Sequence, residues 1–356
     1  MLLPESEQEV RIRFTEEESG SSSEVLAVPG TLEAAGLGEV ASHLGLSGSF
    51  FLVGGHVLQT SLAMHASVFG LSTEDVIPVS LLTFPALREE QDTCQDWIGA
   101  LAGQSVGLYD GTVDGVPTHE GPVKAMALSS REGLRASGGQ DALVKVQGKT
   151  LKGHGTSIDS LTFSGEDRLF SGDFNGMLFA WRRLQEDFEL ATTHSAHAGC
   201  VSGLAALNEE TLVSSSWDHT VKLWDPSRLD LRRGSPKLGT VQLDVCAVLD
   251  RLVAAAGHDG LVRLLDSRGK LVPVSFAKTH SDSVSAVDFD FKTSLLYSAS
   301  HDGTVNAWDL RAVKPLHTYR FSDDSLLALT CDSEDGTVYA GGKAGKLRKL
   351  SLSSSS

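Results

Sequence analysis

Apolar and polar residues alternate with a period of two through most of the chain after about residue 97. Apolar runs end in small residues and a polar turn, and a second alternating run follows, as in LVSSSWDHTVKLWD and LYSASHDGTVNAWD. A period of two places successive side chains on opposite faces of a strand, whereas a helix repeats about every 3.6 residues. This part of the chain is therefore predicted to consist of β-hairpins.

The hairpin pattern occurs in six segments at a regular interval, which marks an internal repeat. Successive turn positions are separated by 34, 43, 41, 43 and 42 residues. These turn positions are Asp141, Asn175, Asp218, Asp259, Asp302 and Ala344. A period of about 40 residues, with two units ending in Trp-Asp, is typical of a four-stranded propeller blade. We therefore predict a propeller over residues 91–356.

A compressed unit precedes these six and raises the expected number of blades to seven. It opens at Asp96-Trp97 and turns at Asp110-Gly111. Because an open ring would leave an unpaired sheet edge, we expect a strand near the start of the repeats to complete the last blade. Two later units depart from the pattern, with Leu265 and Leu350 at the Trp position, and should rely more on apolar packing.

Histidines recur at a fixed distance before the turns. Each lies four residues before an apolar residue that opens a strand, and 21 or 22 residues before the turn Asp or Asn; they are His119, His154, His197 and His280. In three units a Trp follows the turn position by six residues, namely Trp181, Trp224 and Trp308. This spacing resembles the WD-repeat family, in which a His, a strand Ser or Thr, the turn Asp and the Trp form a hydrogen-bonded tetrad.

Two units match the tetrad completely. One set is His197, Ser214 or Ser216, Asp218 and Trp224, and the other is His280, Ser298 or Ser300, Asp302 and Trp308. A buried Asp is costly unless its oxygens accept hydrogen bonds, which His and Trp N–H groups can help to provide. A metal site is the alternative, since His194 and His197 are close in sequence. The His spacing recurs where no second His exists, so the tetrads are favoured.

Residues 1–90 show a different pattern, which predicts a separate small domain. EVRIRF, VLAVPG, SFFLVGGHVLQTSL and VIPVSLLTF contain strand-like runs, and LEAAGLGEVASHLGL has helical spacing. Leu32, Ala35, Val40 and Leu44 can share one face of that helix. The order strand, strand, helix, strand, strand, loop, strand is that of a ubiquitin-like roll. The predicted fold is thus mainly β, a seven-bladed propeller preceded by a small ubiquitin-like α+β domain.

Acidic side chains concentrate in the first domain. Residues 1–95 carry fourteen acidic and three basic residues, and the formal charge of the whole chain is −16. Such a field repels nucleic-acid phosphates and favours cationic surfaces or divalent metal ions, although it also serves solubility. The four cysteines are far apart without a Cys-x-x-Cys pair, which indicates reduced thiols rather than structural zinc.

The combination of an acidic small domain with a WD propeller resembles the Notchless-like-domain proteins of eukaryotic ribosome assembly. The matching segments, in order, are VRIRF, the VP of VLAVPG, GLGEVASHLG, FLVGGHVLQTSL and GLSTED, followed by Asp96-Trp97. Seven expected blades place the chain closer to one branch of this family than to Notchless itself, which has eight. That branch is the WD-repeat subunit of the complex with Pescadillo and the block-of-proliferation protein.

The resemblance implies a non-catalytic assembly factor for the large ribosomal subunit, located in the nucleus, in both nucleolus and nucleoplasm. Its propeller would bind the block-of-proliferation WD-repeat protein and Pescadillo within the pre-ribosomal large-subunit particle. Glu74 in GLSTED matches a loop acid that completes the coordination of Mg²⁺ held by the AAA-type ATPase midasin. Mg²⁺ would therefore be shared in trans and no cofactor held stably, and Asp75 is the weaker candidate. From the residues alone, Ser72 or Thr73 and these acids could instead begin a helix.

Other functional classes are weighed against this one. The chain has no phosphate loop of the G-x-x-x-x-G-K-[ST] type, no His-Glu-x-x-His and no nucleophile elbow, which disfavours an enzyme. A WD-repeat adaptor in another complex, such as a ubiquitin-ligase substrate receptor, would use the same propeller. Direct RNA contact remains open at KAGKLRKLSL, the densest basic run, although a solvated strand edge that resists aggregation is favoured there.

Overall fold

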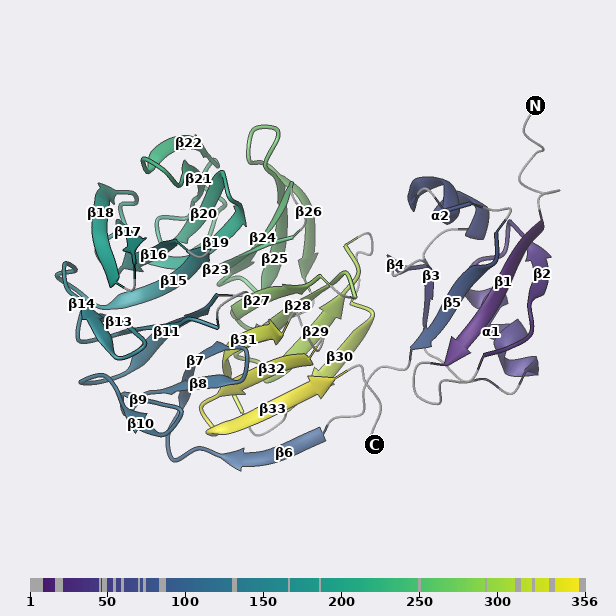
Figure 1. Ribbon diagram of the computed structural model, residues 1–356, viewed down its shortest axis with the longest axis horizontal. Helices are drawn as coiled ribbons and strands as arrows, with labels where there is room; N and C mark the ends of the chain where they lie inside the picture. The colour runs from purple at the N-terminus through teal and green to yellow at the C-terminus, as the bar shows by residue number, and fades with distance from the viewer. Residues whose placement is uncertain are drawn as a thin grey trace.

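The computed structural model describes residues 9–16, 22–44, 46, 50–53, 56–58, 61–69, 71–72, 75–82, 88–129, 133–165, 167–185, 187–248, 251–278, 280–291, 293–310, 315–321, 324–332 and 337–351. Their strands form one five-stranded sheet near the N-terminus and seven four-stranded sheets after it (Figure 1). Within these ranges helix occurs only in α1 (Ala34–His43) and α2 (Leu62–Phe69), and neither is long enough to cross a membrane. The protein is mainly β, as the alternation predicts.

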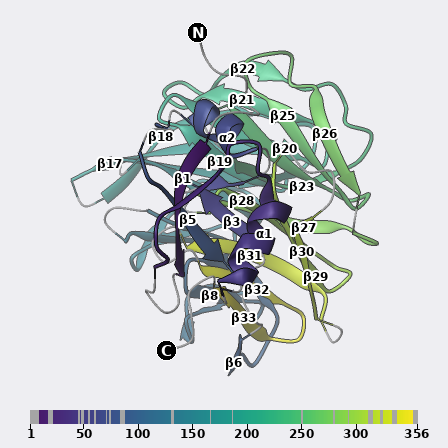
Figure 2. The same cartoon turned by 90° about the vertical axis from the view of Figure 1, so that its right-hand side faces the viewer.

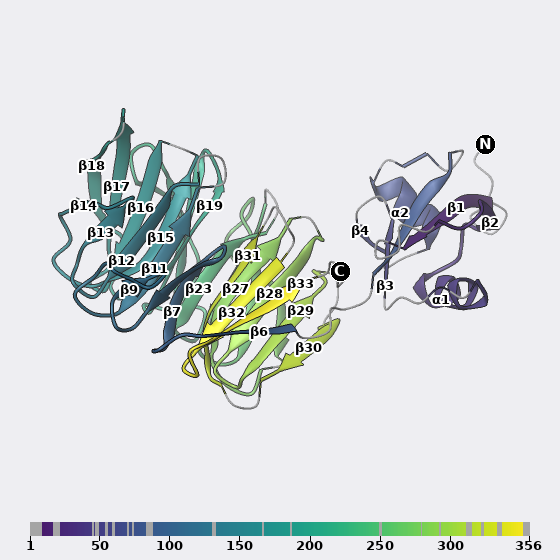
Figure 3. The same cartoon turned by 60° about the horizontal axis from the view of Figure 1, so that its bottom comes forward.

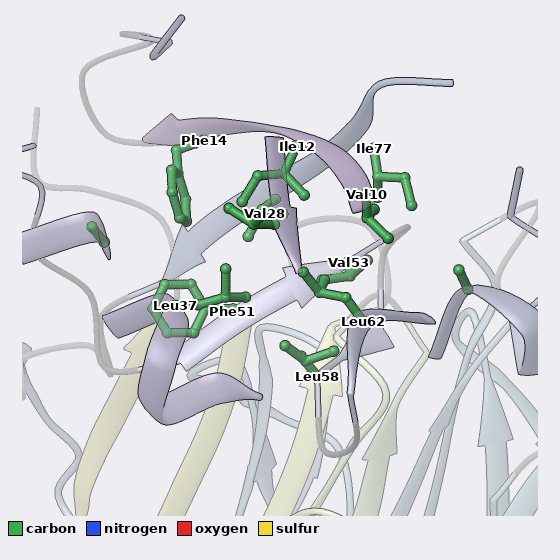
Figure 4. Packing of buried hydrophobic residues seen from close by; sticks show 13 residues of the cluster. Val10, Ile12, Phe14, Val28, Leu37, Phe51, Val53, Leu58, Leu62 and Ile77 are labelled. Carbon is green, nitrogen blue, oxygen red and sulfur yellow. The ribbon is translucent and has the colours of Figure 1, made fainter. Parts of the chain in front are cut away.

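The N-terminal sheet has the strand order β2-β1-β5-β3-β4. Its strands are β1 (Glu9–Glu16), β2 (Leu26–Pro29), β3 (Phe50–Val53), β4 (His56–Val57) and β5 (Ile77–Leu82). At its centre β1 and β5 run parallel, with Ile12 opposite Ile77. Every second residue of β1, from Val10 to Phe14, is fully buried, because alternate side chains of a strand face the same side. Figure 4 shows these side chains packed against Leu37 of α1.

Two details of this small domain differ from the sequence-based expectation. Helix α2 occupies a segment predicted to be strand and loop. Its mostly apolar sequence LAMHASVF shows no clear helical period. Among the side chains of α1 that the structure describes, which do not include Ala35, Leu37 and Ala41 are buried. Leu32 and Val40 pack partly against the core, whereas Leu44 is 44% exposed and does not lie on the packed face. Figures 2 and 3 show the helices and this sheet from two further directions.

The remaining strands form seven consecutive four-stranded sheets. The first sheet contains β7 (Ile98–Ala102), β8 (Ser105–Leu108), β9 (Thr112–Val113) and β10 (Val116–Pro117), the second β11 (Val123–Leu128), β12 (Arg135–Gly139), β13 (Val144–Val146) and β14 (Lys149–Leu151), and the third β15 (Ile158–Ser164), β16 (Arg168–Asp173), β17 (Met177–Leu184) and β18 (Asp187–Ser195). The fourth contains β19 (Val201–Asn208), β20 (Thr211–Ser216), β21 (Val221–Asp225) and β22 (Asp230–Gly234), and the fifth β23 (Gln242–Ala247), β24 (Leu252–Gly257), β25 (Leu261–Asp266) and β26 (Pro273–Lys278). The sixth contains β27 (Val284–Asp290), β28 (Leu295–Ser300), β29 (Thr304–Trp308) and β30 (His317–Arg320), and the seventh β31 (Leu326–Asp332), β32 (Thr337–Gly342), β33 (Lys346–Ser351) and β6 (Arg88–Thr93). The first strand of each sheet contacts the first strand of the next, and β31 returns to β7, so the sheets close a ring.

The seventh sheet takes its outer strand from the beginning of the repeat region. β6 pairs antiparallel with β33, with Thr93 opposite Lys346 and Arg88 opposite Lys349 (Figures 1 and 3). The expected closure by an early strand is confirmed, and β6 crosses the boundary predicted at residue 90. Since β33 is paired on both sides, KAGKLRKLSL is not the solvated strand edge that the sequence favoured.

The seven first strands line a central cavity of about 730 Å³. Each has a β-bulge directly after its first residue, which bends the strand and redirects the side chains that follow. The first residue itself is fully buried in all seven strands, and these residues are Ile98, Val123, Ile158, Val201, Gln242, Val284 and Leu326. Six are apolar and one is glutamine, so one sheet interface holds a polar side chain.

Gln242 is incompletely satisfied in this interface. Its Nε2 donates to the Thr240 carbonyl at 2.8 Å, while its buried Oε1 has no hydrogen-bond partner among the described residues. A buried acceptor that loses its hydrogen bonds to water and gains none from the protein destabilises the folded state. Gln242 therefore weakens an interface that the equivalent apolar residues stabilise.

Two carboxylates connect neighbouring sheets along the cavity. Asp244 Oδ2 accepts from Val287 N at 3.0 Å, and Asp288 Oδ2 accepts from Cys331 N at 2.8 Å. Burial raises the pKa of Asp244 to about 7 and that of Asp288 to about 6, despite the backbone hydrogen bonds that favour their charged forms. The links between the fifth, sixth and seventh sheets thus titrate close to neutral pH.

Gln242→Val is expected to raise the free energy of unfolding by about 1 kcal/mol, because it removes the unsatisfied oxygen and restores the apolar residue of the other sheets. The matched substitution Val284→Gln, at the equivalent position of the sixth sheet, should lower it by about 1–3 kcal/mol. Urea denaturation followed by circular dichroism measures both. Destabilisation by Gln242→Val would show that the Gln242 amide oxygen has a hydrogen-bond donor in solution.

Asp244→Ala is expected to flatten the pH dependence of stability. A carboxyl whose pKa is higher in the folded state keeps its proton where the unfolded chain has lost it, so stability falls as pH rises from about 4 to about 7. Alanine is tolerated there, since it occupies the equivalent position in four other sheets, as Ala100, Ala125, Ala286 and Ala328. Unfolding free energies at roughly pH 5 and pH 8 should differ less in the variant than in the wild type. An unchanged difference would rule out Asp244 as the titrating group.

Candidate functional site

Both predicted tetrads are brought together within single sheets. In the fourth sheet His197 Nδ1 lies 2.9 Å from Asp218 Oδ2, and His197 Nε2 lies 2.7 Å from Ser214 Oγ. Trp224 Nε1 donates to the same Ser214 Oγ at 2.8 Å. Ser214 is therefore the serine of the tetrad, and Ser216 is excluded from it.

The sixth sheet repeats this arrangement, including a threonine hydroxyl beside the turn carboxylate. In the fourth sheet Thr220 Oγ1 donates to Asp218 Oδ1 at 2.6 Å and lies 3.3 Å from His197 Nδ1. His280 Nε2 and Trp308 Nε1 both lie 2.8 Å from Ser298 Oγ. His280 Nδ1 contacts Thr304 Oγ1 at 3.0 Å and lies 3.4 Å from Asp302 Oδ2, and Thr304 Oγ1 in turn donates to Asp302. The threonine hydroxyl thus joins the imidazole to the turn carboxylate.

Each tetrad forms a continuous series of donors and acceptors. The Trp N–H donates to the Ser hydroxyl, the hydroxyl donates to His Nε2, and His Nδ1–H donates toward the Asp carboxylate. Burial lowers the pKa of His197 and of His280 even though Asp218 and Asp302 favour their charged forms, so both rings stay neutral at pH 7. Burial works against ionisation of Asp218, but hydrogen bonds from His197 and Thr220 outweigh it and lower its pKa. A neutral ring with both nitrogens engaged stabilises the sheet and has no lone pair left for catalysis or a metal.

The third sheet also forms a tetrad, and its carboxylate does not come from the turn position that the sequence indicated. His154 Nδ1 lies 2.9 Å from Asp173 Oδ2, and Ser171 Oγ lies 2.6 Å from His154 Nε2 and 2.8 Å from Trp181 Nε1. Asn175, predicted as the turn member, is exposed and its N–H donates to Asp173 Oδ1. The carboxylate thus comes from two residues earlier, at the end of β16, where it also receives an N–H of the turn. The motif SGDFNG contained this signal, because its Asp lies only two residues after the tetrad serine, on the same face of the strand.

Two sheets without a matching His contain a buried ion pair, which the sequence did not indicate. Arg263 donates to Asp259 in the fifth sheet, and Arg348 donates to Asp324 in the seventh. Both arginines are nearly fully buried and lie four residues after a turn position. The sequence predicted that these sheets rely more on apolar packing, and it did not indicate these ion pairs. A buried guanidinium without its carboxylate would be strongly destabilising, so each pair has to be kept or replaced together.

The suggested metal pair is not assembled as one site. His194 lies on the outer strand β18, and its ring meets the Trp224 ring at 5.2 Å, whereas His197 is occupied by Asp218 and Ser214. Among the described residues, no group of three or more His, Cys, Asp or Glu is placed to hold a metal ion. The four cysteines are free thiols, and burial raises the pKa of Cys200, Cys246 and Cys331.

The acidic segment GLSTED lies between α2 and β5. Glu74 lies outside the described residues, while Asp75 is exposed and is followed by Val76, which is 39% exposed. Leu71 packs against the core of the small domain, and Ile77 is buried at the start of β5. The segment is thus anchored at both ends. Ile77 opens a strand, and the described residues around Glu74 do not begin a helix, so the helix-start interpretation is not supported there.

Comparison with known proteins places these features in a wider context. The family model for the WD domain, G-beta repeat, matches residues 146–182, 188–225 and 271–309. The WD40 β-propeller domain of Doa1, known from a crystal structure, superposes with a TM-score of 0.64 at 20% identity, covering 75% of this chain and 96% of that one. The fold is therefore a mainly β propeller of the WD40 type.

Full-length sequence relatives share one description, "Ribosome biogenesis protein WDR12 homolog". The protein from Aedes aegypti is 26% identical and aligns over 84% of this chain and 82% of its own length. That from Oryza sativa subsp. japonica is 26% identical over 90% and 91%, and that from Drosophila persimilis is 27% identical over 88% of each. The similarity thus extends through both the N-terminal part and the propeller.

Asp173→Ala is expected to lower the free energy of unfolding by about 2–3 kcal/mol, because the His154 ring and the turn N–H groups lose their buried acceptor. Asn175→Ala is the matched control and should change it by no more than about 0.5 kcal/mol, as for an exposed side chain. Urea denaturation of both variants measures the difference. A larger loss of unfolding free energy in Asn175→Ala than in Asp173→Ala would show that Asn175, and not Asp173, belongs to the tetrad.

Proposed function

We propose that this chain is a non-catalytic assembly factor for the large ribosomal subunit. The observation that carries the proposal is the similarity to proteins described as ribosome biogenesis proteins over more than four fifths of both chains. The buried, neutral histidines of the tetrads are engaged in structure and leave no evident general base among them. Association with other proteins is the function that the exposed surface serves.

Within this proposal the chain has two parts, a ubiquitin-like domain over residues 1–90 and a seven-bladed propeller over residues 91–356. The strand order β2-β1-β5-β3-β4, with β1 and β5 parallel at the centre and α1 packed on the sheet, supports a ubiquitin-like roll. Seven four-stranded sheets and the contact between β31 and β7 support seven blades.

The small domain presents the Glu74 carboxylate to Mg²⁺ held by midasin. Support comes from the resemblance of GLSTED and from the anchoring of this segment between Leu71 and the start of β5. Magnesium requires about six oxygen ligands in near-octahedral geometry and seldom obtains all of them from one protein. A carboxylate supplied by this chain would complete the set, while the surrounding acidic residues attract the cation at longer range. Asp75, exposed beside it, is the second candidate.

The propeller is proposed to hold the protein to the block-of-proliferation protein and Pescadillo in the pre-ribosomal particle, in nucleolus and nucleoplasm. ATP hydrolysis by midasin would then pull on the small domain and remove the factor complex. In this mechanism the chain transmits force and performs no chemistry. The closed ring of sheets suits that role, since the pairing of β6 with β33 ties the beginning of the repeat region to its end.

Full-length protein is expected to bind the isolated adhesion domain of midasin in the presence of Mg²⁺, with affinity reduced at least tenfold by a chelator. Glu74→Gln should cause a similar loss, because the amide cannot supply a charged ligand to the ion. Isothermal titration calorimetry measures both effects.

Two controls sharpen this experiment. Asp75→Asn removes a neighbouring charge and should reduce binding much less than Glu74→Gln, and Glu39→Gln removes an exposed charge from α1 and should leave it unchanged. Binding that is indifferent to both the chelator and Glu74→Gln would refute the magnesium contact. The chain would then be better described as a WD-repeat adaptor of another complex.

A further inference from the structure

The turn between β21 and β22 packs against the third sheet. It spans residues 226–229, and Leu229 at its end is fully buried in one cluster with Phe170 of the third sheet. Leu229 has a φ of +56°, a left-handed conformation that is unfavourable for leucine and is held here by burial. Its N–H donates to the Asp225 carbonyl at 2.8 Å, and Asp225 Oδ1 accepts the Ser227 N–H at 2.8 Å. The turn is therefore fixed in one conformation beside the third sheet.

Two arginines lie directly opposite each other on the face of the third sheet that meets this turn. Arg168 of β16 is in register with Arg182 of β17. Phe170 and Ala180, two residues away on the same strands, are buried together with Leu229. Because alternate residues of a strand face the same side, both arginines face the fourth sheet. Like charges directly opposite in a sheet are destabilising, so this pair is unfavourable for the fold unless an anion lies beside it.

Ser227 is the residue of the turn that approaches this pair. Its exposed hydroxyl lies 3.4 Å from Arg168 Nη1, across the boundary between the third and fourth sheets. The Arg182 guanidinium makes no hydrogen bond or ion pair with the residues that the structure describes. A guanidinium has five N–H donors, and 3.4 Å is long for a hydrogen bond. The two arginines thus offer more donors toward the turn than the neutral hydroxyl can engage.

The carboxylates near Ser227 do not cancel this positive charge. Asp225 already has a cationic partner, because Arg232 Nη2 donates to its Oδ2 at 3.0 Å. The hydrogen bonds from the Ser227 N–H and from Arg232 lower the pKa of Asp225. On the third sheet, Glu189 of β18 is in register with Arg182. The row of Arg168, Arg182 and Glu189 therefore carries one more positive than negative charge.

We propose that Ser227 is a phosphorylation site, and that its phosphate joins the third and fourth sheets by binding Arg168 and Arg182. In the transfer step Ser227 Oγ attacks the γ-phosphorus of a nucleoside triphosphate on a protein kinase. The bond from that phosphorus to the β-phosphate oxygen breaks, the nucleoside diphosphate leaves, and the hydroxyl proton passes to a base of the kinase. The hydroxyl is exposed to such an enzyme and already points to the guanidinium that would receive the product.

Phosphate matches this place in charge and in geometry. A phosphoserine carries roughly two negative charges at neutral pH and three acceptor oxygens, and a guanidinium binds such a group through two parallel hydrogen bonds. A free anion would use the same donors but would not be attached to the fourth sheet, so only the covalent phosphate links the two sheets. This inference involves neither Glu74 nor magnesium, and it is tested independently of the proposed function.

The test uses full-length protein with phosphoserine installed at position 227 during translation. Hydrogen–deuterium exchange of the peptide that contains the Leu229 amide should slow about tenfold relative to the unmodified protein, because new charge-assisted hydrogen bonds must break before the turn opens. Arg168→Gln in the phosphorylated chain should remove most of this slowing, and Arg182→Gln should remove part of it. Mass spectrometry of the protein isolated from its own cells should locate a phosphate on Ser227.

Matched controls separate the phosphate contact from general effects of charge. Arg320→Gln removes an exposed arginine from β30 in the sixth sheet and should leave the slowing intact. Arg168→Gln without phosphoserine measures the effect of the substitution alone, which completes a double-mutant cycle, and circular dichroism confirms that all variants are folded.

Four outcomes would each overturn the proposal. They are equal exchange with and without phosphoserine, slowing that survives Arg168→Gln combined with Arg182→Gln, equal slowing of the unmodified protein by inorganic phosphate, and an unmodified Ser227 in protein from both growing and resting cells.

Discussion

Closure of the ring is the constraint on which the propeller depends. Each sheet buries its faces against two neighbours, so a missing partner would expose apolar residues such as Ile98 on one side and Leu326 on the other. Pairing of β6 with β33 joins the beginning of the repeat region to its end. A chain segment before the first sheet thereby becomes part of the last one, and the seven sheets form a single structure rather than a row of independent hairpins.

Polar groups inside the sheets follow one rule although their residues differ. Three sheets use a His, a Ser, an Asp and a Trp, and the second has His119, Ser137 and Asp141 with Gln147 at the Trp position. The fifth and seventh substitute a buried Arg–Asp pair. In the seventh the carboxylate, Asp324, comes from the connection before the first strand, where other sheets place their histidine. What is preserved is the pairing of buried donors with acceptors, not one set of residues.

The candidate magnesium-binding segment lies on a connection of the small domain, whereas the tetrads fix turns of the propeller. Of the segment between α2 and β5, the described residues Ser72 and Asp75 are exposed, while Leu71 packs against the core. In the second to seventh sheets a buried His–Asp or Arg–Asp contact lies under the turn and fixes its backbone. A rigid scaffold with variable turns is a general way for propellers to acquire partners.

The sequence by itself determined the strand content, the repeat and the residues of two tetrads, because alternation and fixed spacing are local properties of the chain. It left Ser214 and Ser216 undecided, since both face inward and only the distance to His197 separates them. It misplaced the acid of the third sheet at Asn175, missed α2, and gave no sign that Arg263 and Arg348 would be buried. These outcomes depend on which distant groups meet in space. The tertiary structure alone decided them, because the energy of a buried charge or hydrogen bond is set by its partner and not by its position in the sequence.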